Sequence, residues 1–211
     1  MNELNHPKQL SEDQIKAASK LLARAFQDDP LLVYLYPDPL KRKIESDIVW
    51  EFSILQGILY GEANITSSDI EGVAVWLAHP LKDQKPREQS KVINRRMRKV
   101  GREMFSGPIF TEKYNNWAQM IVSLQIEHAN FPHWELAILG VDPMYQGKGY
   151  ASMLIRTKLR ELDKQNLSCY LHTENKRNIN LYEHFGFELV GEVKVPNSNV
   201  IYYGMLRNKK K

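Results

Sequence analysis

The chain has a single cysteine, Cys169, among its 211 residues. One thiol excludes an intramolecular disulfide and a cysteine-rich zinc site, and it is compatible with a reducing cytoplasm. Six histidines are present, but the sequence contains no His-Glu-x-x-His pattern. We therefore expect no metal. Because Cys169 falls in a strand-like pattern, we expect a buried and unreactive thiol.

Long apolar runs are also missing. No stretch reaches the eighteen or so apolar residues of a membrane span, and residues 1–10 lack the apolar segment of a secretory signal. No internal repeat or Gly/Ser-rich linker divides the chain. With 43% apolar residues and a net charge of +4, residues 1–211 are predicted to form one globular domain. We expect a cytoplasmic monomer or homodimer with no nucleic-acid or membrane partner.

Several familiar signatures are absent as well. The chain has no Gly-x-Ser-x-Gly elbow of a serine hydrolase. Lys148 stands between Gly147 and Gly149, which excludes a Walker A loop, and the repeated βαβ setting of a dinucleotide site is missing. What is present is an apolar run over 135–141, then Asp142-Pro143, a glycine-bearing turn, and a helical repeat of apolar residues over 151–162. A strand, a glycine turn and a helix start direct backbone N–H groups at one place, which predicts a pyrophosphate cradle.

The turn reads Gln146-x-x-Gly149-x-Ala151, and a second motif follows it. There Asn175 leads to a Leu-Tyr-Glu element around Tyr182, which closes on Gly186-Phe187. In this order the two motifs resemble the acyl-CoA-binding motif and its continuation in the GNAT superfamily of N-acetyltransferases. The residues at 72–77, 133–134 and 187–207 look most like the branch of puromycin N-acetyltransferase and similar small-molecule acetyltransferases. Read without the resemblance, the glycines serve tight turning, and Asn175 and Gly186 start and end a helix.

The resemblance implies an α/β GNAT fold, with a mixed, mainly antiparallel sheet and helices on both faces. Its fourth and fifth strands, expected at 134–141 and 168–174, are parallel and splayed apart. It also implies acetyl-CoA as the acyl donor and direct acetyl transfer to a small amine-bearing molecule. A first strand belongs to this fold, although residues 1–10 show no clear alternation.

The matching positions give the implied site. Main-chain donors are expected at Leu139 and Val141, with Gly140 allowing close approach, and Tyr182 matches the general acid that protonates the departing thiolate. The other implied donor-binding residues are Gln146, Gly147, Lys148, Gly149, Tyr150, Ala151, Asn175 and Asn178. From the residues alone, ordinary sheet pairing and a packed helix tyrosine are the alternatives.

Glu135 is the predicted base, because strand alternation places it on one face with Leu139 and Val141. It would take the proton of the amine directly or through water. The puromycin-type branch commonly carries an aromatic residue here, so the match fails, and a solvated or salt-bridged Glu135 is the alternative. Asp28 and Asp29 would attract a cationic acceptor, but helix capping is the favoured use.

The remaining pattern predicts a helix that starts at a Ser11–Gln14 capping box and carries Ile15, Ala18 and Leu22 on one face. A further helix over 42–60, strands over 63–67 and 71–77, and a closing hairpin over 189–195 and 200–206 are expected. A helical insertion is expected over about 80–131, with a basic helix and then an apolar one over 109–127. The basic helix carries Lys91, Arg95, Arg96, Arg98, Lys99 and Arg102.

A solvated basic face is favoured over a nucleic-acid site or a site for the 3′-phosphate of CoA, since no aromatic stacking platform accompanies the arginines. Two other functions stay open. One is a non-catalytic acyl-CoA-binding module, and the other is an acetyltransferase directed at a protein or nucleic acid.

Overall fold

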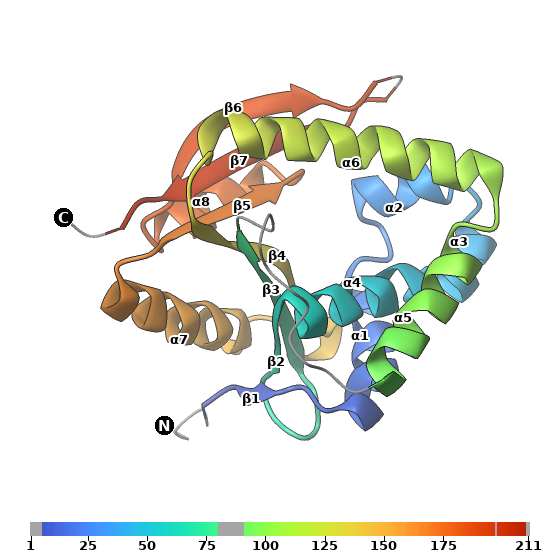
Figure 1. Ribbon diagram of the computed structural model, residues 1–211, viewed down its shortest axis with the longest axis horizontal. Helices are drawn as coiled ribbons and strands as arrows, with labels where there is room; N and C mark the ends of the chain where they lie inside the picture. Colours follow the sequence, from blue (N-terminus) through green and yellow to red (C-terminus); the bar gives the residue numbers. More distant parts are fainter. Residues whose placement is uncertain (1–5, 80–90, 197, 210–211) are drawn as a thin grey trace.

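The computed structural model describes residues 6–79, 91–196 and 198–209. A seven-stranded sheet runs through the molecule in the order β1-β2-β3-β4-β5-β7-β6 (Figure 1). The strands are β1 Lys8–Gln9, β2 Gly61–Ile65, β3 Gly72–His79, β4 His133–Val141, β5 Ser168–Thr173, β6 Glu188–Lys194 and β7 Ile201–Arg207. Neighbouring strands are antiparallel except β4 and β5, which are parallel. The predicted mixed sheet is confirmed.

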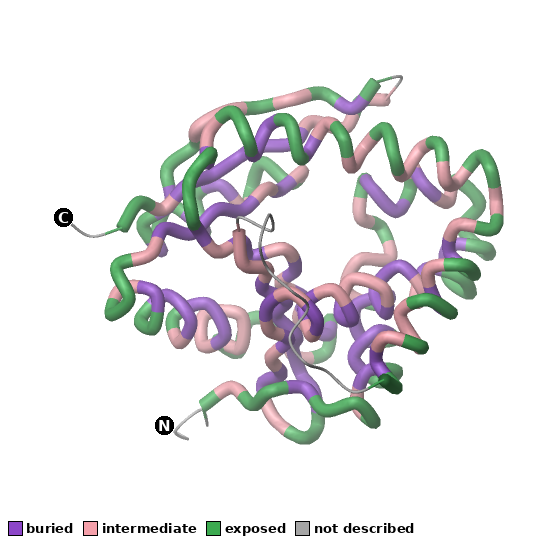
Figure 2. The backbone as a smooth tube through the Cα atoms, viewed as in Figure 1, coloured by how far each residue is buried: buried purple, intermediate pink, exposed green. Residues whose placement is uncertain are grey.

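Helices cover both faces of this sheet, as predicted. Residues of α1, α2, α4, α5 and α6 join the apolar core on one face, and α7 and α8 join the core on the other; Figure 2 shows the buried backbone between these layers. The helices are α1 Ile15–Ala25, α2 Pro30–Leu35, α3 Pro39–Glu45, α4 Asp47–Tyr60, α5 Lys91–Met104, α6 Pro108–His128, α7 Tyr150–Gln165 and α8 Arg177–Glu183. Within the described ranges, no helix has the length and apolarity needed to span a bilayer.

The first helices follow their local sequence signals. The Ser11 N–H donates to the Gln14 side chain at 3.1 Å, and the short 3₁₀ turn there leads into α1, as the capping box predicts. Asp29 caps α2, because its Oδ1 accepts the N–H groups of Leu31 at 2.9 Å and Leu32 at 3.3 Å. The single helix predicted over 42–60 is wrong in its start: α3 ends at Glu45 and α4 begins at Asp47.

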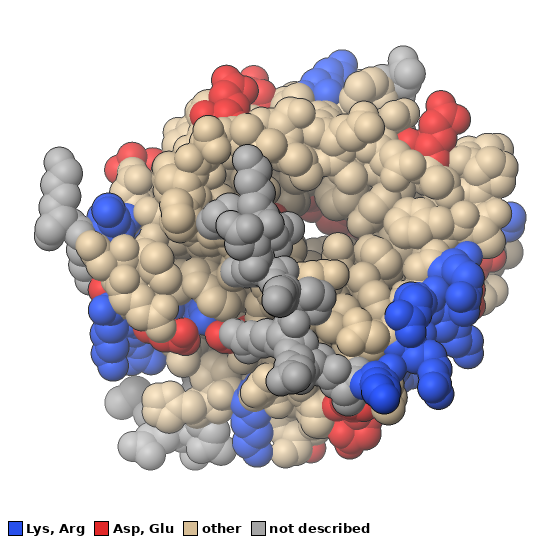
Figure 3. Space-filling model, viewed as in Figure 1, with Lys and Arg blue, Asp and Glu red and all other residues tan. Residues whose placement is uncertain are grey.

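The predicted insertion contains two helices in its described part, and residues 80–90 lie outside the described residues. The long α6 packs on β6 and β7. The outer side of α5 carries Lys and Arg side chains that form the largest blue area of the face in Figure 3. The exposed ones are Lys91, Arg95, Arg98, Lys99 and Arg102. A solvated basic face is what the sequence favoured.

The parallel strands β4 and β5 pair over only part of their length. Their register runs from His133 opposite Ser168 to Leu136 opposite Leu171, and no pairing follows. On the other side of β4, Trp76 pairs with Leu136 while Val75 pairs with Ile138, so Ala137 is an extra residue. Such a bulge bends the strand that contains it. The remainder of β4, up to Val141, therefore diverges from β5, and the predicted splay is confirmed.

Gly140 lies in the diverging part of β4, under α1. A Cβ atom at Gly140 would come within 2.5 Å of Leu22 Cδ2 and 3.0 Å of Phe26 Cε2. The sequence predicted that this glycine admits a donor molecule closely. The structure gives another reason for it, which is the close packing of α1 on the strand.

We predict that Gly140→Ala lowers the free energy of unfolding by about 1–3 kcal/mol, the usual cost of overpacking. Gly101→Ala is the matched control, because a Cβ there would meet only Phe52, at an ordinary 3.5 Å, in the interior of α5. It should leave stability unchanged or raise it by up to about 1 kcal/mol. Urea denaturation measures both variants, and equal stability of the two would contradict the packing argument.

Candidate active site

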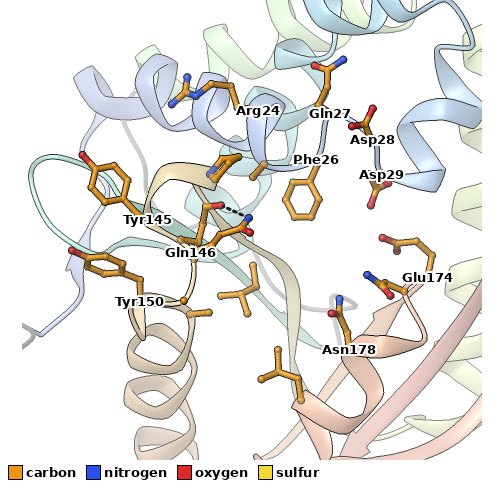
Figure 4. Close-up of a pocket in the computed structure, with 18 of the residues that line it drawn as sticks. Arg24, Phe26, Gln27, Asp28, Asp29, Tyr145, Gln146, Tyr150, Glu174 and Asn178 are labelled. Carbon is orange, nitrogen blue, oxygen red and sulfur yellow. Dashed lines mark hydrogen bonds between the residues drawn. The ribbon is translucent and has the colours of Figure 1, made fainter.

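A cavity of about 1050 Å³ opens where β4 and β5 diverge. Its walls come from residues 24–30 between α1 and α2, the outer part of β4, the turn into α7, and the segment from the end of β5 into α8 (Figure 4). Most of the predicted donor-binding residues line it: Leu139, Val141, Gln146, Gly147, Gly149, Tyr150, Ala151, Asn175 and Asn178. Tyr182 lines it as well. Segments far apart in sequence thus meet at one cavity.

The turn before α7 has the backbone of an anion cradle. Gly147 and Gly149 have φ values of +75° and +86°, in the left-handed region that favours glycine. Gly149 is the N-cap of α7, and the first intrahelical bond runs from Met153 N–H to the Gly149 carbonyl at 3.0 Å. The N–H groups of residues 150–152 therefore have no partner within the helix. Free amides and the positive end of a sixteen-residue helix together suit a phosphate.

The turn is held by a buried aspartate. Asp142 Oδ1 accepts the N–H of Met144 at 3.1 Å, and its Oδ2 accepts the Nε of Arg24 at 3.0 Å. Burial opposes ionisation of this carboxyl, but the hydrogen bonds from Arg24 and Met144 outweigh it and lower the pKa of Asp142. Arg24 also lines the cavity. Nothing in the sequence indicated this arginine, because only the packing of α1 on β4 brings it to the turn.

The diverging part of β4 presents main-chain donors to the gap. The N–H of Asp142 bonds the Glu71 carbonyl on the β3 side at 2.9 Å. Successive N–H groups of a strand point to opposite sides, so those of Val141 and Leu139 point away from β3, toward the gap. The side chains of both residues line the cavity. The N–H groups of Leu139 and Val141 are thus open to a ligand in the gap, and their role in donor binding stays a prediction.

The segment after β5 supplies the far wall. Asn175 Oδ1 accepts the N–H of Arg177, the first residue of α8, at 3.1 Å. The side-chain amide of Asn178 donates to Thr173 Oγ1 at 3.3 Å. The buried Tyr182 is on the inner side of α8, and its ring meets Phe187 edge-on. Burial, and then the charge of Glu174, raise the pKa of Tyr182, so its hydroxyl is protonated at neutral pH.

Two carboxyl groups from different segments of the cavity wall face each other. Glu174 directly follows β5, Asp29 directly precedes α2, and Figure 4 shows their side chains pointing toward one another. Burial, a hydrogen bond with Asp29 and the charge of Asp29 raise the pKa of Glu174. Sequence reasoning missed Glu174 and explained Asp29 as a cap. The sequence signals no pairing here, since the two residues meet only through the tertiary fold.

Glu135 does not line the cavity, and the predicted face is wrong. The extra residue at Ala137 shifts the alternation, so Glu135 points to the same face as Ile138, whereas Leu139 points to the other. Glu135 Oε2 is 2.9 Å from His79 Nε2 and accepts from Gln125 at 3.2 Å, and its Oε1 is 3.5 Å from His172 Nδ1. These partners outweigh burial and lower its pKa. This is the salt-bridged alternative raised from the sequence.

Lys148 also lies outside the cavity lining. Its ammonium donates to the Met144 carbonyl at 3.3 Å and is 5.0 Å from the centre of the Tyr145 ring. The exposed side chain is still within the cradle turn. Its predicted role in donor binding stays a prediction.

Comparison with known proteins identifies the family. A model of the acetyltransferase (GNAT) family matches residues 78–187, more than half of the chain. The chain belongs to the GNAT acetyltransferase family. The fold, with parallel and splayed β4 and β5, is the GNAT fold, and acyltransferase activity with acetyl-CoA as donor is the family's chemistry.

Individual relatives agree with this assignment. An uncharacterized N-acetyltransferase, C550.08 of Schizosaccharomyces pombe, is 26% identical over 186 residues, which cover 85% of this chain and 73% of that protein. A Corynebacterium glutamicum structure described as histone acetyltransferase HPA2 and related acetyltransferase has a TM-score of 0.66 at 18% identity, over 98% of this chain and 97% of that one. Arylalkylamine N-acetyltransferase 2 of Aedes aegypti has a TM-score of 0.60 at 14% identity, over 96% and 98%. At these identities the two structures show a common fold.

We predict that Asp142→Asn lowers stability near neutral pH by about 1 kcal/mol, because a mostly exposed Arg24 is screened by solvent. Asparagine keeps the acceptor for Met144 but loses the charge. A carboxyl whose pKa is lowered by folding contributes stability above its ordinary pKa and loses it as the pH falls through the folded value. The difference from the wild type should therefore be full above the ordinary pKa of an aspartate and decrease as the pH falls below it.

Urea denaturation at a series of pH values measures this difference. Asp38→Asn is the control: Asp38 caps α3 through Leu40 and Lys41 N–H groups and is exposed, and asparagine caps equally well. A difference for Asp142→Asn that stays constant down to pH 3 would contradict the assigned role of its charge.

Proposed function

We propose that this protein transfers the acetyl group of acetyl-CoA directly to the amine of a small molecule. The observation that carries the proposal is the single cavity, which extends from a helix-start cradle, past the β4/β5 gap, to Tyr182. The proposal places the enzyme in the cytoplasm as a monomer or homodimer, without a nucleic-acid or membrane partner. The lone cysteine supports the reducing compartment.

The donor is proposed to bind with its diphosphate on the main chain of Gln146, Gly147, Lys148, Gly149, Tyr150 and Ala151. A Cβ at Gly147 would meet nothing within 4 Å, which leaves the approach to these amides open. Asn175 and Asn178 would support the donor from the opposite wall. The amides of Leu139 and Val141 would then donate hydrogen bonds to the pantetheine and the acetyl oxygen. A hydrogen bond to the acetyl oxygen polarises the thioester carbonyl.

Tyr182 is proposed as the acid that protonates the leaving sulfur. A phenol has an ordinary pKa of about 10 and a thiol of about 8.5, so complete transfer is uphill by about 2 kcal/mol. This gap is small beside a chemical barrier. The raised pKa of Tyr182 makes the gap larger in the free protein, so the acid needs a change in its surroundings during the reaction.

The aromatic side chains of α6 do not line the cavity, but the Trp117 ring is 6.3 Å from that of Tyr202, which the charges of Glu174 and Asp29 reach. These aromatic side chains support a small acceptor. Tyr114 and Trp117 of α6 contact each other at 5.2 Å between ring centres, and Lys113 reaches the Tyr34 carbonyl at 2.9 Å. The fold is shared with an arylalkylamine N-acetyltransferase. The resemblance to the puromycin-type branch points to small molecules as well.

The exposed basic side of α5 favours a second candidate, an acetyltransferase directed at an acidic protein or a nucleic acid. Such an acceptor would bind with a steep dependence on salt, whereas a small amine in the cavity would not. A third candidate, a non-catalytic acyl-CoA-binding module, predicts donor affinity without thiol release.

A thiol-release assay with acetyl-CoA separates these functions. Alkylamines, arylalkylamines, diamines, peptides and a duplex DNA are offered at low and high salt. Thiol release with a small amine that changes little with salt supports the proposal. Donor binding by calorimetry with no thiol release from any amine would favour the binding module instead.

We predict that Tyr182→Phe lowers kcat about 10²-fold or more, the usual contribution of a general acid, while the affinity for acetyl-CoA stays within about twofold. Tyr203→Phe is the matched control, since Tyr203 is a buried phenol on β7 that does not line the cavity. It should keep the wild-type kcat. Unchanged turnover of Tyr182→Phe would remove the acid role.

A further inference from the structure

The two facing carboxyl groups occupy the end of the cavity away from the cradle. Figure 4 shows Asp29 and Glu174 across the cavity from Tyr145, Gln146 and Tyr150. We propose that Glu174, held by Asp29, binds the ammonium group of the acceptor and accepts its proton. This inference rests on the proposed acetyl transfer and names the acceptor class, a primary amine that is cationic when it binds.

Asp29 is fixed in place by the start of α2. Its Oδ1 accepts the N–H groups of Leu31 at 2.9 Å and Leu32 at 3.3 Å. Figure 4 shows the same carboxyl group pointing toward Glu174. Glu174 is fixed in turn by its place directly after β5, on the diverged side of the sheet. The pair is thus built into two separate parts of the fold.

Two carboxyl groups that face each other favour a state with one proton between them and one negative charge. That arrangement is costly in a partly buried wall unless a cation compensates it. No Lys or Arg forms an ion pair with either carboxyl among the described residues. A bound ammonium would supply the missing positive charge.

A further polar group beside the pair also lacks a partner. The hydroxyl of Tyr202, a residue only 1% exposed, is near enough for the charges of Glu174 and Asp29 to act on it. Its ring centre is 6.3 Å from that of Trp117, but neither the hydroxyl nor the indole nitrogen makes a hydrogen bond of good geometry. Buried polar groups usually find a partner. The Tyr202 hydroxyl does not line the cavity, so it adds polar character near the carboxyl pair without contacting a ligand there directly.

The proton count of the reaction closes with these groups. The ammonium first gives one proton to the Glu174–Asp29 pair, which later releases it to solvent. The neutral nitrogen forms a bond to the thioester carbonyl carbon, and the carbon–sulfur bond then breaks. Tyr182 gives its proton to the departing sulfur, and the second proton lost by the nitrogen restores the phenol. The products are the N-acetylated amine, the free thiol and one proton.

Proton uptake by the pair also makes Tyr182, whose pKa is raised in the free protein, a better proton donor. The charge of Glu174 is one cause of the raised pKa of that phenol. When the pair takes the proton of the amine, its charge disappears and the phenol becomes a stronger acid. The base and the acid are therefore coupled, so that a proton accepted at one group favours a proton donated by the other.

Glu174→Gln is the direct test, because glutamine keeps the size and hydrogen bonding of the side chain but cannot accept the proton. We expect kcat/KM for an alkylamine to fall about 10²-fold or more. In the wild type kcat/KM should rise as the pH rises through ionisation of the pair, and this rise should be absent in Glu174→Gln. The other ionisable groups around Glu174 are Tyr182 on α8, Tyr202 on β7, and Asp28 beside Arg42. Asp28→Asn removes the exposed carboxyl group next to Asp29 and should keep the rise.

Three further measurements sharpen the test. Glu174→Asp, with a shorter carboxylate, should recover part of the activity and the pH dependence. Asp29→Asn keeps the cap of α2 and should lower kcat/KM about tenfold, while Asp38→Asn, the same change at the exposed cap of α3, should change nothing. Calorimetry without donor should detect alkylammonium binding by the wild type and lose it in Glu174→Gln, with acetyl-CoA affinity unchanged in both.

The outcomes separate this inference from the proposed function. If the wild type releases no thiol with any amine, acetyl transfer itself is wrong. If the wild type acetylates amines but Glu174→Gln keeps its rate and pH dependence, the carboxyl pair has no role and only this inference is overturned. A wild type that prefers arylamines, which are uncharged at neutral pH, to alkylamines would overturn it as well.

Discussion

Two parallel strands share hydrogen bonds only while they run side by side, and β4 and β5 do so only as far as Leu136 and Leu171. The extra residue at Ala137 turns β4 away at that point. The main-chain groups of the last residues of β4 that point toward β5 therefore pair with no strand. Backbone groups in such a position need another partner. The gap is therefore where we propose that a ligand with an amide or carbonyl group binds, and the other walls of the cavity lie around it.

The charges of the cavity are separated along its length. Helix-start amides and Arg24 lie at one end, whereas Asp28, Asp29 and Glu174 lie at the other. An anionic diphosphate and a cationic amine would therefore enter opposite ends, with the gap and Tyr182 between them. Opposite potentials at the two ends would orient both molecules before they react. This separation links the donor site to the proposed acceptor class.

Much of this fold follows from local signals in the sequence. The glycine turn at 146–149 and the caps at Ser11 and Asp29 each act over a few residues, and the structure has them where the sequence predicts. Glu135 was misplaced because a bulge is one inserted residue that leaves no mark in the pattern, yet it moves the side chain to the other face. Arg24 and Glu174 were missed because their partners, Asp142 and Asp29, are distant in sequence and meet only after the sheet and α1 have packed.

The central claim is that the main chain of β4 beyond Ala137 is left free to bind the acyl donor. Amide hydrogen exchange with residue resolution tests it most directly. In the free protein the amides of Leu139 and Val141 should exchange faster than those of Ile138 and Gly140, which face β3. Saturating acetyl-CoA should slow the exchange of Leu139 and Val141 selectively. Protection of all four amides in the free protein, or no change on adding acetyl-CoA, would contradict the account.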